Sequence, residues 1–131
     1  YNSLLIDMDK MKDYVTESNL ILEEYVKNKE KVDSAKGEYI SRLLTIKRGM
    51  ESANTSFLFD KYKVIKISSI ELLIEAISEE NKNDKEEYLK LVFKSDNESQ
   101  DELDKLVEKI EGSWTNVIGF PLEKFILLLT N

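Results

Sequence analysis

Histidine and cysteine are both missing from this chain of 131 residues. Without histidine, the usual forms of Ser–His–Asp hydrolysis, His-ligated zinc, haem on a proximal histidine and the Glu-x-x-His di-iron site of helical bundles cannot be built. Without cysteine, disulfides and thiolate metal sites are excluded as well. The two absences predict a protein that is not an enzyme, with no catalytic residue, no metal site and no bound cofactor.

Glycine and proline are scarce, with four glycines and one proline. A β-sandwich or β-barrel has many turns, and each turn usually needs one of these residues. We therefore expect long elements with few connections. The chain also lacks a run of about 18 apolar residues, the length that spans a bilayer. Its longest apolar cluster covers only residues 125–129, so no segment is expected to cross a membrane.

Basic residues are outnumbered, since 19 lysines and arginines face 26 carboxylates and the formal net charge is −7. A nucleic-acid-binding surface needs a basic face that displaces counterions from the phosphates, so the charge argues against such a partner. Arg42 and Arg48 are the only arginines, and alanine, the best helix former, occurs three times. This bias indicates the codon usage of an AT-rich genome, and we expect a bacterial protein from a low-GC organism.

An apolar stripe with heptad-like spacing dominates the first two-fifths of the chain. Alternating steps of four and three residues from Leu4 give Met8, Met11, Val15, Ser18, Leu22, Tyr25, Lys29, Val32, Lys36, Tyr39, Leu43, Ile46, Met50, Ala53 and Phe57. A period of 3.5 residues places these side chains on one helical face that must be buried. The stripe loses its apolar character over residues 27–38. We favour a turn between two antiparallel helices there, near residues 33–37. The alternative is one long helix, which would form a rod and self-associate through this N-terminal helical stripe.

Connections and helices alternate through the rest of the chain. A small polar stretch over residues 49–56 indicates a connection. Residues 57–67 alternate partly like a strand, but they continue at helical spacing without a pairing partner, so we expect a helix. Residues 78–84 indicate a loop, with Asn83 or Asp84 as the N-cap of the next helix. A polar stretch over residues 94–102 separates that helix from one that starts at Leu103, and Gly119 and Pro121 precede a short terminal helix.

These patterns predict an all-α fold, an antiparallel helical bundle of four to six helices, some long, with short polar connections. We expect residues 1–131 to form a single helical-bundle domain, because this length can bury a core without disulfide or metal staples. Adjacent carboxylates such as Glu79 and Glu80 point in different directions on a helix and cannot act as a paired acid and base.

Four aromatic residues are the candidates for partner or ligand contact: Phe57, Phe59, Tyr62 and Trp114. The first three lie at an expected connection, and Trp114 lies between two glycines. Aromatic side chains at such positions pack in a core more often than they face a partner, and we keep both interpretations. An exposed aromatic residue would make a good anchor for a protein partner.

The favoured function is that of a non-catalytic helical protein-interaction module with a protein partner. Because the sequence starts at Tyr1 rather than at a methionine, we expect a preceding segment that could hold an export signal or a lipid anchor, which slightly favours an extracytoplasmic location over the cytoplasm. The alternative is a small acidic cytoplasmic inhibitor, of the immunity-protein type, that blocks a basic target. A weaker alternative is a small-ligand carrier with a pocket between helices.

Overall fold

Five α-helices and one short 3-10 helix account for most of residues 2–110, which are the residues that the computed structural model describes. They are α1 (Asn2–Lys27), α2 (Lys29–Ser34), α3 (Lys36–Ser52), η1 (Phe57–Phe59), α4 (Asp60–Ser78) and α5 (Lys82–Ile110). No strand occurs within this part of the chain. The predicted all-α bundle is confirmed, and the segment with partly strand-like alternation forms η1 and the start of α4.

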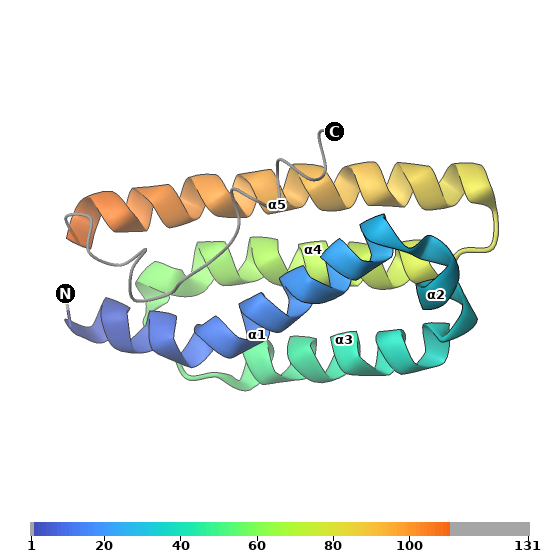
Figure 1. Cartoon of the computed structure of the whole chain (residues 1–131). Helices are drawn as coiled ribbons and strands as arrows, with labels where there is room; N and C mark the ends of the chain where they lie inside the picture. Colours follow the sequence, from blue (N-terminus) through green and yellow to red (C-terminus); the bar gives the residue numbers. More distant parts are fainter. Residues whose placement is uncertain (1, 111–131) are drawn as a thin grey trace.

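The four long helices alternate in direction along the bundle, and α2 turns the chain from α1 into α3 at one end (Figure 1). Helix α4 packs most extensively against α5, and α3 packs against both α1 and α4. The favoured turn within residues 27–38 is therefore confirmed. It contains two breaks: one at Asn28, whose side chain accepts a hydrogen bond from the Lys31 N–H, and one at Ala35. The rod is excluded because α1 and α3 fold back on each other.

Buried side chains on α4 and α5 follow the spacing of a coiled coil. The buried residues with this spacing are Tyr62, Lys66, Ser69, Leu73 and Ala76 on α4 and Leu89, Val92, Asp96, Ser99, Leu103 and Leu106 on α5; Ile70 and Ile77 of α4 are buried outside it. Steps of three and four residues alternate in both sets, so each helix presents one narrow seam to the other. We call this antiparallel pair the α4–α5 hairpin.

The predicted break over residues 94–102 is wrong, because α5 is continuous from Lys82 to Ile110. Asp96 and Ser99 lie in phase with the apolar positions of the seam and are buried, so the polar stretch continues the helix face instead of interrupting it. The expected N-cap of this helix is wrong as well. The Asn81 carboxamide oxygen, rather than Asn83 or Asp84, caps it by accepting a hydrogen bond from the Asp84 N–H at 3.1 Å.

The N-terminal stripe supplies much of the remaining core. Eleven of its members are buried: Met8, Met11, Val15, Ser18, Leu22, Tyr25, Val32, Tyr39, Leu43, Ile46 and Met50. Ser18 is tolerated there because its hydroxyl donates a hydrogen bond to the Val15 carbonyl at 2.9 Å. Two stripe members, Lys29 and Phe57, are exposed, because Lys29 lies at the start of α2 and Phe57 at the start of η1, where the chain turns.

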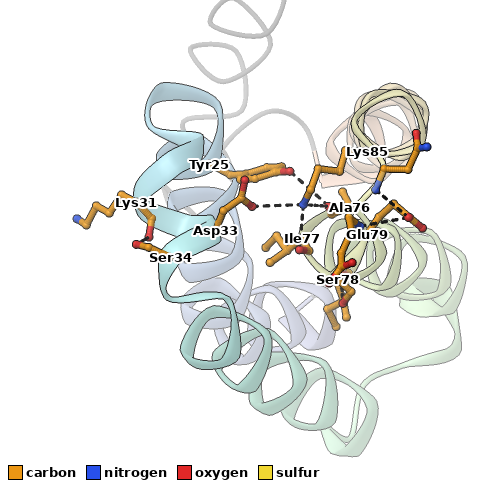
Figure 2. A network of polar contacts seen from close by, with 12 residues as sticks. Tyr25, Lys31, Asp33, Ser34, Ala76, Ile77, Ser78, Glu79 and Lys85 are labelled. Atoms are coloured by element: carbon orange, nitrogen blue, oxygen red, sulfur yellow. Dashed lines mark hydrogen bonds and ion pairs between the residues drawn. The ribbon is translucent and has the colours of Figure 1, made fainter.

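Lys85 ties the α4–α5 turn to α2 (Figure 2). Its ammonium donates hydrogen bonds to the carbonyls of Ala76 at 3.0 Å and Ile77 at 3.1 Å, and it lies 3.3 Å from an Asp33 carboxylate oxygen on α2. The Tyr25 hydroxyl of α1 also donates to the Ala76 carbonyl, at 3.4 Å. A cation here satisfies carbonyls of the last helical turn and opposes the negative end of the helix dipole.

Substitution of the two glycines of α3 should have opposite effects on the free energy of unfolding. A Cβ atom built on Gly49 overlaps the ring of Tyr14 on α1, whereas one built on Gly37 meets nothing within 4 Å. We expect Gly49→Ala to destabilise by about 1–3 kcal/mol through overpacking. Gly37→Ala should stabilise by up to about 1 kcal/mol, because alanine favours the helix. Urea unfolding of both variants measures the difference.

The Tyr14→Ala background provides the control for this pair. Without the ring, Gly49→Ala should stabilise α3 as Gly37→Ala does. If Gly49→Ala remains as destabilising in that background as in the wild type, the contact with Tyr14 is not the cause.

Candidate functional site

The predicted aromatic candidates separate into core and surface residues. Phe59 and Tyr62 are buried and pack edge to face, with ring centroids 5.2 Å apart. Phe57, two residues before Phe59, is 79% exposed. Trp114 lies outside the described residues. The structure therefore brings Phe59 and Tyr62 together inside the bundle and leaves Phe57 as the exposed aromatic candidate among these three.

The connection that carries Phe57 is fixed first by Asp7 of α1. One Asp7 carboxylate oxygen accepts a hydrogen bond from the Ser56 N–H at 2.7 Å, and the Asp7 side chain is buried. Ser56 in turn caps η1, because its hydroxyl oxygen accepts a hydrogen bond from the Leu58 N–H at 3.2 Å. Asp7 thus stabilises the turn that starts directly before Phe57.

Two lysines hold the earlier part of the same connection. Lys63 of α4 donates hydrogen bonds to the Ala53 carbonyl at 2.6 Å and to the Thr55 hydroxyl at 3.2 Å. Lys10 of α1 donates to the Asn54 carbonyl at 2.9 Å. Side chains from α1 and α4 therefore clamp residues 53–59 from both sides, while buried Phe59 anchors the end. We call residues 53–59 the clamped loop.

The clamped loop presents apolar surface in a defined conformation. Leu58 next to Phe57 is also exposed, at 38%. An aromatic side chain has few rotatable bonds, so on a backbone that is already fixed it loses little conformational entropy when a partner covers it. The clamped loop itself contains no ionisable side chain, and its exposed apolar surface suits contact with an apolar group.

A buried polar layer, which the spacing of apolar residues does not predict, connects three helices of the bundle. Lys66 of α4 donates hydrogen bonds to an Asp96 carboxylate oxygen at 3.0 Å and to the Asn19 carboxamide oxygen at 2.8 Å. The Ser69 hydroxyl donates to the same Asp96 oxygen at 2.5 Å. These four residues, which we call the polar layer, are each at most 3% exposed and connect α1, α4 and α5.

The polar layer favours one pairing of the helices over others. A buried ion pair contributes little net stability, because removing two charges from water costs about as much as their attraction returns. Its best-documented use within a helical seam is to specify register. Any slip of α4 along α5 would leave Lys66 or Asp96 buried against apolar side chains. The sequence signal was present, since both residues lie in phase with the seam, but charged residues are normally assigned to the surface.

Neither of two shallow depressions on the described surface is lined by Phe57, Phe59 or Tyr62. One, of about 290 Å³, lies on α1 and α2 and is lined by Leu20, Glu23, Glu24, Lys27, Asn28 and Lys31. The other, of about 180 Å³, lies between α1 and α3 and is lined by Tyr14, Glu17, Ser41, Arg42, Thr45 and Ile46. Among the described residues, no histidine, cysteine or carboxylate cluster is suited to hold a metal ion.

No helix of the described residues is both long enough and apolar enough to cross a bilayer. Comparison of the chain with family models, with curated proteins and with solved structures finds no match. A proposal about function therefore depends on the geometry described above.

Removal of Lys66 should be far more damaging than removal of a surface lysine. Lys66→Met leaves the Asp96 carboxylate buried without its cation, and we expect a loss of about 3–5 kcal/mol in the free energy of unfolding. Lys66→Met/Asp96→Leu should recover at least half of this loss. Lys61→Met is the control, because the pair of Lys61 with Glu102 at 3.1 Å involves a lysine that is 70% exposed. It should cost less than about 1 kcal/mol. Equal losses for Lys66→Met and Lys61→Met would contradict the assignment.

Buried tyrosines should make the protein unfold at alkaline pH. Burial, aided by the charge of Asp33, raises the pKa of Tyr25 to about 12, and burial with the charge of Asp96 raises the pKa of Tyr62 further. Tyrosines of the unfolded chain ionise near pH 10, so above that pH the unfolded state releases protons that the folded state retains. Stability is thus fully present below about pH 10 and falls as the pH rises towards about 12.

Urea unfolding at several values between about pH 9 and about pH 11.5 measures this dependence. Tyr25→Phe should flatten the decline, since phenylalanine has no proton to lose. A decline that is equally steep in Tyr25→Phe and wild type would show that Tyr25 does not cause it.

Proposed function

We propose that this protein is a non-catalytic helical module that binds a protein partner through the clamped loop, with Phe57 as the anchor. The observation that carries the proposal is the 79% exposure of Phe57 on a loop whose backbone is held by Asp7, Lys10 and Lys63. Exposed aromatic side chains on preorganised backbone are the usual form of a binding hot spot.

The residues around Phe57 favour an apolar contact over an electrostatic one. Leu58 adds apolar area beside it, while the adjacent exposed charges of Asp60 and Lys61 are of opposite sign. A partner that fits this site would provide an apolar pocket for one aromatic ring with a polar rim. Its affinity should then depend little on salt concentration.

Phe57→Ala should weaken the complex at least about tenfold without unfolding the protein, because Phe57 contributes little to the core. A photo-crosslinking amino acid at position 57, used in cells of the source organism, identifies the partner. Calorimetric titration of that partner then compares wild type with Phe57→Ala.

Leu91→Ala is the matched control, since Leu91 is 45% exposed on the N-terminal half of α5, far along the hairpin from the clamped loop. Truncation of Leu91 should leave the affinity unchanged. If Phe57→Ala binds as tightly as Leu91→Ala, the clamped loop is not the docking site.

A second candidate function, an acidic inhibitor of a basic target, is favoured by the charge at the opposite end of the hairpin. Seven carboxylates surround the α4–α5 turn: Glu71, Glu75, Glu79, Glu80, Asp84, Glu86 and Glu87. Within residues 71–87 the basic residues are Lys82 and Lys85, and the Lys85 ammonium is directed inward to Asp33 and the carbonyls of α4. Two of the seven carboxylates pair with lysines outside this stretch, Glu71 with Lys47 at 3.5 Å and Glu87 with Lys90 at 3.3 Å, which leaves five. Binding of this kind would weaken steeply with added salt, so the same titration at low and high salt separates the two functions.

A further inference from the structure

Four buried polar atoms beside the Lys66–Asp96 pair have no hydrogen-bond partner within the described part of the chain. They are the second carboxylate oxygen of Asp96 (Oδ2), the carboxamide oxygen of Gln100 (Oε1), the carboxamide nitrogen of Asn19 (Nδ2) and the hydroxyl of Tyr62. Buried polar groups in folded proteins are almost always paired with protein or with ordered water. Such a concentration of unpaired atoms from three helices therefore requires an explanation.

The orientation of both amides is set by hydrogen bonds that they already make. The Asn19 oxygen accepts from Lys66 at 2.8 Å, so the Asn19 nitrogen is the free group. The Gln100 nitrogen donates to an Asp104 carboxylate oxygen at 2.8 Å, so the Gln100 oxygen is free. Two of the four atoms are therefore acceptors, on Asp96 and Gln100. The other two, on Asn19 and Tyr62, are donors.

The four groups lie within about one helical turn of one another along the bundle. Asp96 and Gln100 are one turn apart on the same face of α5, a rise of about 6 Å. Tyr62 precedes Lys66 by one turn on the seam of α4. Asn19 is joined to Asp96 through the Lys66 ammonium, which contacts both. Because α4 and α5 are antiparallel, Tyr62 lies on the side of the polar layer towards Gln100.

We propose that one internal water molecule binds among Asn19, Tyr62, Asp96 and Gln100. Water donates two hydrogen bonds and accepts two, which is the complement of two free acceptors and two free donors. Neither kind of ion fits this site. The oxygens of Asp96 and Gln100 would repel an anion, and the Lys66 ammonium together with the two donors would repel a cation. The site therefore selects a small neutral molecule with both donor and acceptor capacity. The water completes the hydrogen bonding of Asp96, whose other oxygen is bound by Lys66 and Ser69.

A high-resolution crystal structure of the full chain tests the site directly. The expected result is an ordered water within hydrogen-bond distance of the Tyr62 hydroxyl and the free Asp96 oxygen. A direct hydrogen bond between Tyr62 and Asp96, with no water between them, would overturn the proposal.

Magnetic relaxation dispersion of water provides a second test in solution, since it detects water molecules that stay inside a protein. Tyr62→Phe/Gln100→Met removes one donor and one acceptor with little change of volume, and the signal should fall by the contribution of one molecule. Tyr25→Phe is the control, because the Tyr25 hydroxyl already donates to the Ala76 carbonyl, and its signal should equal that of the wild type. An unchanged signal in the folded double variant would also overturn the proposal. If the double variant does not fold, the presence or absence of the ordered water in the wild-type crystal structure decides whether the proposal holds.

Discussion

The ion pair between Lys66 and Asp96 is the constraint on which the arrangement of the described helices depends. It lies within the most extensive helix contact, and the Lys66 ammonium also donates a hydrogen bond to Asn19 of α1, a helix that packs mainly on α3. Apolar side chains alone would allow α4 and α5 to pair at several offsets, since leucine and isoleucine pack against each other in many registers. One charged pair, whose cost of burial is recovered only when both partners meet, makes one register preferable.

The spacing of apolar residues predicts the helical class, the turn within residues 27–38 and most of the core residues that α1, α2 and α3 contribute. It failed where polar residues occupy core positions, because Asp96 and Ser99 were assigned to a connection although they continue the seam of α5. Their phase with the apolar positions of the seam is the only local signal, and it is outweighed because polar side chains are normally exposed. The charge of Asp96 is compensated by Lys66, which is 30 residues away in the chain, so only the folded arrangement identifies this pairing.

The candidate site was predicted in part for a related reason. Phe57, Phe59 and Tyr62 were recognised as a group, but the sequence could not assign them to core or surface. The division follows from the clamp, in which Asp7 and Lys63 orient the backbone so that Phe59 points inward and Phe57 outward. These clamping contacts span 49 and 10 residues of sequence. The exposed Phe57 at one end of the bundle and the carboxylates around the α4–α5 turn at the other are separate features of a single scaffold.

The polar layer also has a consequence for how the molecule opens. It divides the seam of the hairpin into two apolar parts, one with Leu73, Ala76, Leu89 and Val92 towards the turn, the other with Tyr62, Leu103 and Leu106 towards the clamped loop. Each part has its own hydrophobic contacts and is joined to the other through hydrogen bonds and charge. We therefore expect the two ends of the hairpin to behave as separate cooperative units in amide exchange, each opening without the other.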